Sequence, residues 1–372
     1  MNTTIRGRGR RRGAAAEGMA TIRDVAQASK VSIATVSRAF NGSALVRGDT
    51  RRKVLAMASR LGYWPNGIAR SLITNRTHAL GVLLPDLFGE FFSEVVHGMD
   101  LAGRERGYHL LISRTSSSAD DLIDAARTMR GRVDGLIVMA PGFDPTPAVR
   151  HGGRAVPAVL INPQRTPPGC DSVSIANAKG AAAAVSHLIG LGHRSIGFLS
   201  GPESNVDARQ RRDGWHAALS AAGIEPTSDL EYGGDFTEHS GYDVVGKMLR
   251  SSRRPTALFA GNDYMAVGAL GALHDAGVRV PEDIAVVGFD DIALARYLNP
   301  PLTTVRVEML GLGRRAVEIL LERADRAPGA VERHEVLATT LVVRSSCGAG
   351  PADASGHRHP GNGHGALPTS RR

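Results

Sequence analysis

Polar residues that could bind a small molecule directly follow several apolar runs of this chain. The runs "GVLLP", "AVLI", "TALFAG" and "IAVVGF" are followed in turn by Asp86, Asn162, Asn262 and Asp290. Arg209 lies at the start of an amphipathic segment after "SIGFLSG", and Phe92 opens the segment that follows Asp86. A carboxylate, an arginine and amides around an aromatic ring suit a polyhydroxylated ligand. The alternative left open is that these side chains only stabilise loops.

A second group of chemically suited residues lies in the stretch "TIRDVAQASKVSIATVSRAFNG", from Thr21 to Gly42. The outward positions of its second helical pattern would enter a DNA major groove. There Arg38 can donate two hydrogen bonds to guanine O6 and N7, Ile33 and Ala34 can meet a thymine methyl, and hydroxyl groups suit phosphate oxygens. The predicted DNA contacts in this stretch are Thr21, Ser32, Ile33, Ala34, Thr35, Ser37, Arg38 and Asn41. The alternative is a small structural three-helix module.

Three short helices must share one core to position these DNA contacts. Thr21 and Asp24 have the spacing of a capping box at the start of the first helix, and Ser32 is the expected cap of the second. We expect the third helix to run from Thr50 to Leu61. The inward apolar positions of the three helices are Ile22, Val25 and Ala26, then Val36, Ala39 and Phe40, then Val54, Ala58 and Leu61. None of the three is long enough to be stable alone, so this pattern predicts a helix-turn-helix head.

The charge distribution favours a nucleic-acid partner for this head. The chain of 372 residues carries a formal net charge of +9. Residues 1–76 hold 15 Lys and Arg against 3 Asp and Glu, so all the excess positive charge lies there and the remainder is slightly acidic. Such asymmetry is typical of a DNA-binding head on a near-neutral body. A solvated basic face without a partner is the alternative.

Composition and motifs argue against several other classes of protein. The chain is 42% hydrophobic and 22% charged, and it contains no apolar run of the length that spans a membrane. Cys170 and Cys347 form neither a disulfide framework nor a metal-binding spacing, and no secretory signal is present, so we expect a cytoplasmic protein. We find no phosphate-binding glycine loop between a strand and a helix, no G-x-S-x-G elbow and no zinc-spaced histidine pair. We therefore expect no catalytic activity, no cofactor and no metal.

After about Ala79 short apolar runs alternate with amphipathic segments of helix length. The runs are "ALGVLLP", "HLLIS", "VDGLIVMA", "AVLIN", "SIGFLSG", "TALFAG" and "IAVVGFD". The intervening helical segments are Glu90–Arg106, Asp120–Arg130, Ala178–Leu191, Asp207–Ala222, Glu238–Arg250 and Asp263–Ala276. This alternation predicts an α/β fold of parallel sheets covered by helices, divided into two lobes with a ligand cleft between them.

The motifs resemble those of the lactose/galactose repressor (LacI/GalR) family. The head and "RRKVLAMASRLGYWPNGIARSL" carry the resemblance first, followed by "GVLLPDLFGEFFSEVVHGMD", "RQRRDGWHAAL", "FAGNDYMAVGAL", "IAVVGFDDIALARYLNPPLTTVR" and "LVVRSS". It covers roughly Thr21 to Ser346. The resemblance implies a helix-turn-helix head joined to a two-lobed effector domain like a periplasmic binding protein. We expect a basic tail at 1–18, the head at 19–66, a hinge at 67–78, the effector and dimerisation domain at 79–346, and a tail at 347–372.

The same resemblance implies a repressor of sugar-metabolism genes that binds palindromic operator DNA as a homodimer and responds to a carbohydrate effector. It implies that Arg209 and Asp290 hold the polar edge of the effector, that Phe92 and Phe236 stack on its ring, and that Leu72 of the hinge enters the minor groove. The rival classes are an enzyme and a secreted sugar-binding protein, and binding of the chain to DNA from its own upstream region would separate them.

Two departures from the family pattern affect the head and the hinge. Where the family starts its third helix with a Ser-Pro-type cap, this chain has Arg47 and Gly48, so we expect a shifted or frayed start in which Asp49 is the cap. Gly67 stands where the family hinge has alanine, and glycine costs about 1 kcal/mol in a helix. We therefore expect this hinge to be less ordered without DNA.

Overall fold

The computed structural model describes most of the chain in two compact units, residues 1–77 and 78–372. The described residues are 20–40, 43–63, 76–86, 89–115, 118–150, 156–251, 253–327 and 330–349. Each unit is described by itself.

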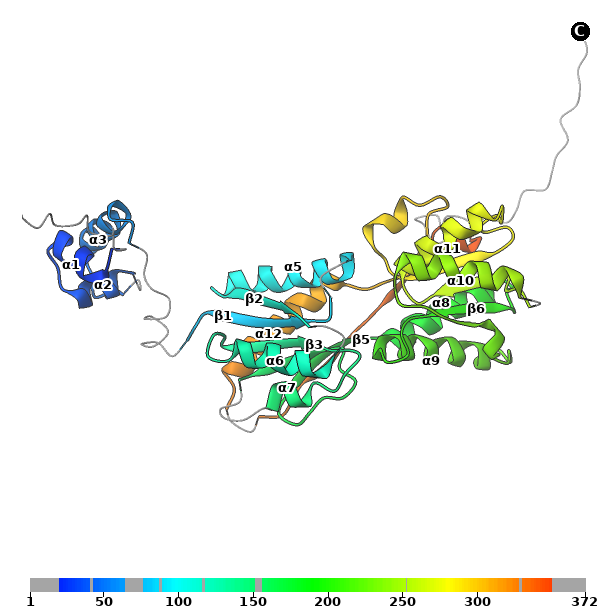
Figure 1. The fold of residues 1–372 in the computed structure, drawn as a ribbon, viewed down its shortest axis with the longest axis horizontal. Helices are drawn as coiled ribbons and strands as arrows, with labels where there is room; N and C mark the ends of the chain where they lie inside the picture. The colour runs from blue at the N-terminus through cyan, green and yellow to red at the C-terminus, as the bar shows by residue number, and fades with distance from the viewer. Residues whose placement is uncertain are drawn as a thin grey trace, which may run out of the picture. The chain divides into compact units, whose positions relative to one another are not determined.

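Three helices form the described part of the first unit (Figure 1): α1 (Ile22–Ser29), α2 (Ile33–Phe40) and α3 (Gly48–Arg60). The predicted capping box is confirmed, because Asp24 N donates to Thr21 Oγ1 while Thr21 N donates to Asp24 Oδ2. Ser32 caps α2 as predicted, accepting a hydrogen bond from Thr35 N at 3.1 Å. The shared core consists of Val25, Ala26, Val36, Ala39, Val54 and Ala58. The three short helices are therefore held together by their inward faces.

The start and end of α3 differ from the prediction. The helix begins at Gly48, two residues before the expected Thr50, and its N-cap Arg47 makes no side-chain cap. Asp49 is not the cap, because it lies within the first turn and its Oδ1 accepts from Thr50 N at 2.7 Å. Leu61 follows the last helical residue and is 39% exposed, so it does not join the core. Tyr63 packs there instead, with its ring edge against Phe40.

The second unit contains two six-stranded sheets, one in each lobe, as the alternating pattern predicted (Figure 1). The first sheet has the order β11 (His334–Leu337), β5 (Asp171–Ile175), β4 (Ala158–Ile161), β3 (Gly135–Met139), β1 (Ala79–Leu84), β2 (His109–Arg114). The second has the order β12 (Thr340–Val342), β10 (Thr303–Arg306), β9 (Ala285–Asp290), β8 (Ala257–Ala260), β6 (Ile196–Ser200), β7 (Glu231–Gly233). Neighbouring strands are parallel except the pair of β10 and β12.

Helices cover both faces of each sheet because the central strands are apolar on both sides. In the first lobe, α5 (Glu90–Glu105) and α12 (Met309–Ala324) pack together on one face, and α6 (Ala119–Met129) and α7 (Thr146–Arg150) lie on the other. In the second lobe, α8 (Asn177–Gly190) pairs with α9 (Val206–Ala221), and α10 (Glu238–Arg250) pairs with α11 (Asp263–Asp275). None of the helices in the described part of the chain is long and apolar enough to cross a membrane.

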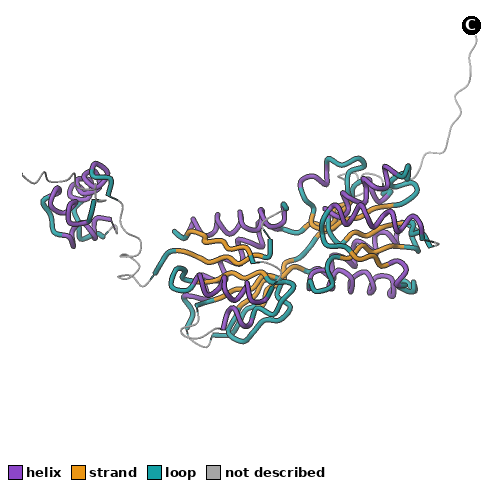
Figure 2. The backbone as a smooth tube through the Cα atoms, in the orientation of Figure 1, coloured by secondary structure: helices purple, strands orange, loops and turns teal. Residues whose placement is uncertain are grey.

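The chain passes between the two lobes three times, after β5, after β10 and after β11, as the tube in Figure 2 shows. After β10, which belongs to the second sheet, the chain returns to the first lobe, where α12 packs on β3, β4 and β5. These crossings place the carboxyl ends of the strands of both lobes around one cavity.

The prediction from apolar runs did not identify the strands that carry polar residues. The strand β5, "DSVSI", is buried even though it begins with Asp171. Arg323 and Arg326 pair with Asp171 at 2.9 and 3.2 Å. These ion pairs join residues more than 150 positions apart, so no local pattern indicates them.

Candidate functional site

The recognition face of the head lies on α2. Ile33, Ala34 and Arg38 are exposed there, and 45% of Ile33 is accessible, which is high for a large apolar side chain. Thr35 and Ser37 are half-buried. Ile33 at the start of α2 and Arg38 in its last turn are both exposed, and such side chains can meet methyl groups and base edges in a major groove. Asn41 and Leu72 lie outside the described residues, and the roles of all these side chains stay predictions.

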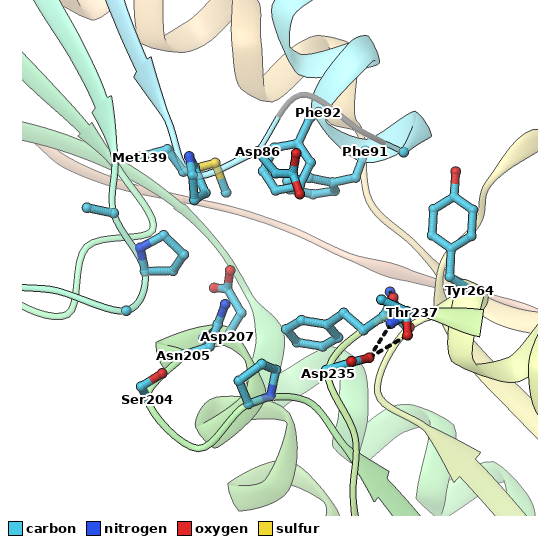
Figure 3. A pocket seen from close by; sticks show the side chains of 18 of the residues that line it. Asp86, Phe91, Phe92, Met139, Ser204, Asn205, Asp207, Asp235, Thr237 and Tyr264 are labelled. Carbon is cyan, nitrogen blue, oxygen red and sulfur yellow. Dashed lines mark hydrogen bonds between the residues drawn. The ribbon is translucent and has the colours of Figure 1, made fainter. Parts of the chain in front are cut away.

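A cavity of about 600 Å³ lies between the two lobes of the second unit (Figure 3). The first lobe contributes residues that follow β1 and β3 and the start of α5, and the second lobe contributes residues that follow β6, β7, β8 and β9. Five of the seven residues predicted to bind the effector line this cavity: Asp86, Phe92, Phe236, Asn262 and Asp290. The cavity is large enough for a sugar or a nucleoside.

Arg211, not Arg209, is the arginine at this cavity. Arg211 is only 4% exposed, and its guanidinium donates to Asn177 Oδ1 and to the Gly261 carbonyl. It also lies 3.8 Å from the centre of the Phe289 ring. Arg209 instead donates from Nη1 to the carbonyl oxygens of Glu203 and Ser204, both at 2.8 Å. Two residues along a helix correspond to a rotation of about 200°, so the two side chains leave α9 in nearly opposite directions.

The helical periodicity of α9 could have indicated that Arg211, and not Arg209, is buried. The buried residues of this helix are Val206, Asp207, Ala208, Arg211, Gly214, Trp215, Ala218 and Leu219. Asp207, Arg211, Trp215 and Ala218 follow helical spacing, so the stripe that contains Trp215 also contains Arg211. Arg209 falls between the turns of that stripe.

Asn162 also lies behind the cavity wall instead of lining it. It is 3% exposed, its Nδ2 donates to Asp207 Oδ2 at 3.2 Å, and its Oδ1 accepts from Ile175 N at 3.1 Å. Asn162 follows β4 in the first lobe and Asp207 lies in the first turn of α9 in the second, so this hydrogen bond joins the lobes. Asp207 lines the cavity and was not predicted.

Asp290 lies at the floor of the cavity beside Arg211. Its Oδ1 is 3.3 Å from Arg211 Nη2, which is an ion-pair distance, but this oxygen accepts no hydrogen bond from the described residues. Burial raises the pKa of Asp290 to about 6, and the nearby Arg211 charge opposes that shift. Burial also raises the pKa of Asp207, against the opposing effects of Arg211, Asn177 and Asn162. The floor therefore combines two buried carboxyl groups with one guanidinium.

Aromatic rings from both lobes face the cavity. Phe91 and Phe92 of α5 meet edge to face with centroids 5.4 Å apart, and both line the cavity while packing against the core. Phe236 comes from the second lobe, where Asn262 Nδ2 donates to its carbonyl at 3.0 Å. A Cβ atom at Gly201 would lie 2.2 Å from the Phe236 ring, so only glycine there leaves room for it.

Direct hydrogen bonds bridge the lobes beside the cavity. Glu90 of α5 accepts from Ala293 N at 2.6 Å, and its own N–H donates to the Tyr264 hydroxyl at 2.8 Å. Elsewhere at the lobe junction, Gln164 Nε2 donates to the Ser204 carbonyl at 2.7 Å. The lobes are therefore joined around the cavity by contacts that a change in their relative angle would break.

Two family models match the chain. Residues 21–66 match the model described as bacterial regulatory proteins, lacI family, and residues 185–347 match a periplasmic binding protein-like domain. Among curated relatives, the ribose operon repressor of Escherichia coli strain K12 is 35% identical over 88% of this chain and 100% of its own length. The HTH-type transcriptional repressor PurR of Mannheimia succiniciproducens is 34% identical over 88% of this chain and 98% of its own length.

Solved structures agree with this match. A lac repressor dimer bound to operator and the anti-inducer ONPF superposes with a TM-score of 0.81 at 33% identity, covering 89% of this chain and 100% of that one. A complex of the regulator CelR with cellobiose has a TM-score of 0.67 at 33% identity, covering 88% of this chain and 99% of that one. Whole-length identity above 30% with the head and both lobes in the same order leads to one conclusion: the chain belongs to the lacI family of bacterial regulatory proteins and is an effector-responsive, DNA-binding transcriptional regulator.

Proposed function

We propose that this regulator is a repressor of sugar-metabolism genes, that it binds a palindromic operator as a homodimer, and that a carbohydrate in the cavity between the lobes changes its operator binding. The observation that carries the proposal is the cavity lining, in which Arg211, Asp207 and Asp290 occur together with the rings of Phe92 and Phe236. Carboxylates and a guanidinium can accept from and donate to adjacent hydroxyl groups, while aromatic faces cover the C–H side of a sugar ring.

The names of the related proteins support a carbohydrate. One relative is a ribose operon repressor, one structural neighbour was solved with cellobiose, and another, from Enterococcus faecium, with bound ribose. The PurR relatives are transcriptional repressors whose description names no sugar, so the test panel also includes nucleobases. The cytoplasm, where chromosomal operators lie, stays the predicted compartment.

The coupling follows from the position of the cavity. A ligand that touches both lobes stabilises one angle between them, and an effector shifts an equilibrium only through such differential affinity. The hydrogen bonds of Glu90 to Tyr264 and Ala293 join the lobes, so movement of α5 away from the second lobe would break them. Effector binding therefore selects a lobe arrangement, and we propose that operator affinity depends on it.

Fluorescence anisotropy with DNA from the region upstream of the gene tests the proposal. We expect tight binding to that DNA, a steep fall of affinity with salt as phosphate counterions are released, and a shift in affinity with one sugar of a panel that includes nucleobases. Asp290→Asn should lose the sugar response and keep ligand-free DNA binding, and Asp213→Asn, on the exposed face of α9, is the matched control. Absence of DNA binding would point to an enzyme or a transport protein instead, and a response to nucleobases alone would reject the carbohydrate.

A further inference from the structure

Asp207 places a second carboxylate in the effector cavity, beside the Asp290 carboxylate. It is the second residue of α9, is 6% exposed and lines the cavity, where Figure 3 shows its carboxyl group directed into the open space. Its Oδ1 accepts from Asn177 Nδ2 at 2.8 Å and its Oδ2 accepts from Asn162 Nδ2 at 3.2 Å. The two amide donors favour the ionised form of this carboxyl group and so oppose the rise in its pKa that burial causes.

The side-chain amides that donate to Asp207 have a fixed orientation and cannot be flipped. Asn177 Oδ1 accepts from Arg211 Nε at 2.9 Å, and Asn162 Oδ1 accepts from Ile175 N at 3.1 Å, so each amide must direct its Nδ2 at Asp207. The position of α9 adds to this, because a helix N-terminus favours negative charge in its first turn. The carboxyl group of Asp207 is therefore fixed in place with donors on both oxygens.

The described lining of the cavity holds one guanidinium and five carboxylates, of which Asp86 also lies 4.0 Å from Arg114 outside the lining. Arg211 already donates to Asn177 and to the Gly261 carbonyl and is paired with Asp290. The lining carboxylates are Asp86, Asp207, Asp235, Glu238 and Asp290. Asp290 Oδ1 is buried 3.3 Å from Arg211 Nη2 and accepts no hydrogen bond from the described residues, so it can accept one from a ligand hydroxyl.

We propose that Asp207 selects against anionic effectors, so that the cavity takes unphosphorylated sugars and amino sugars and rejects sugar phosphates and sugar acids. The inference rests on the proposed carbohydrate function and narrows it. An anionic group would enter a space lined by carboxylates and lose its hydration without a free cation in return. Sugar hydroxyls and a protonated amine are donors, and they match the acceptors of Asp207 and Asp290.

Matched sugar sets test this selection on the full-length protein. Calorimetry would compare glucose, galactose and ribose with glucose 6-phosphate, galactose 6-phosphate and ribose 5-phosphate, and with glucosamine and galactosamine. We expect each phosphate to bind at least about tenfold more weakly than its parent sugar, and the amino sugars to bind as well as the parents or better. Operator anisotropy in the same solutions shows which sugars act as effectors.

Two variants assign the selection to Asp207. Asp207→Asn keeps the shape and removes the charge, and Asp207→Ser serves if the amide disturbs Asn162 and Asn177. In either, the ratio of phosphate to parent affinity should rise about fivefold or more, while Asp213→Asn, with the same charge change on the exposed face of the helix, should leave it unchanged.

The outcomes distinguish a failure of the selection against anionic effectors from a failure of the proposed carbohydrate function. A wild-type protein that binds a sugar phosphate more tightly than its parent overturns the inference and leaves the carbohydrate function standing. An unchanged ratio in both Asp207 variants overturns it as well. If none of the sugars binds or alters operator affinity, the proposed carbohydrate function falls, and the selection falls with it.

Discussion

Replacing the two arginines of α9 separately distinguishes the cavity arginine from its neighbour. Arg211→Gln removes a guanidinium that is 4% exposed and leaves the carboxylates of Asp290 and Asp207 without a cation. Arg209→Ala removes two hydrogen bonds to loop carbonyls from a half-buried side chain. Only the first change creates uncompensated charge inside the protein, so the two variants should differ strongly.

The expected magnitudes follow from burial. Breaking a buried ion pair by removing one partner costs about 3–5 kcal/mol. Because both partners are almost fully buried, solvent screening does not reduce this figure. The two hydrogen bonds of Arg209 are partly open to water, and their loss should cost about 1 kcal/mol. Against a typical unfolding free energy of about 5–15 kcal/mol, Arg211→Gln should be severe and Arg209→Ala mild.

The pH dependence of the stability lost in Arg211→Gln provides an independent check of this reasoning. The charge of Arg211 lowers the pKa of Asp290, which burial raises to about 6, so removing Arg211 moves that pKa higher still. A carboxyl group with a raised pKa in the folded state stabilises the fold below its unfolded pKa, and this contribution is lost as pH rises through the folded pKa. The Arg211→Gln deficit should therefore be smaller at pH 5, where Asp290 binds a proton, than at pH 8.

Urea unfolding at pH 5 and pH 8 measures both effects on stability, and calorimetry with whichever sugar of the panel binds the wild-type protein measures binding. We expect Arg211→Gln to lose sugar binding and Arg209→Ala to keep it within a small factor. Loss of sugar binding in Arg209→Ala with retention in Arg211→Gln would refute the assignment. A deficit that does not change with pH would refute the account of the buried carboxylates.

Three further predictions concern the head and the lobe junction. Ser32→Ala removes the cap that accepts from Thr35 N and should cost about 1 kcal/mol of α2 stability, seen as faster amide exchange in α2 of the intact chain. Arg38→Ala should cost about 1–3 kcal/mol on the operator, mostly at one base pair in each half-site; an equal loss on every DNA sequence would make it a phosphate contact. Glu90→Gln weakens the bond from Ala293 N by about 1 kcal/mol, so sugar affinity should fall about fivefold in calorimetry, and unchanged affinity would show that sugar binding does not depend on this bridge.

Local signals in the sequence determined the elements of this protein. The apolar runs became the central strands because a strand buried on both faces needs apolar residues at successive positions. The capping box of Thr21 and Asp24 and the cap Ser32 were predictable because each bond joins residues three positions apart. The placement of Asp86, Asn262 and Asp290 at the cavity followed from their position after strands of parallel sheets.

Only the tertiary structure decided which side chains reach the cavity. Arg209 and Arg211 are two residues apart in the sequence, and the packing of α9 on its sheet directs Arg211 inward and Arg209 to the loop carbonyls. Asn162 follows a strand as the prediction required. Its amide, however, donates to Asp207 of the other lobe, and Asn162 lies behind that residue instead of lining the cavity. The physical reason is the same in both cases: side-chain direction and burial depend on partners brought from distant parts of the chain, which no local pattern specifies.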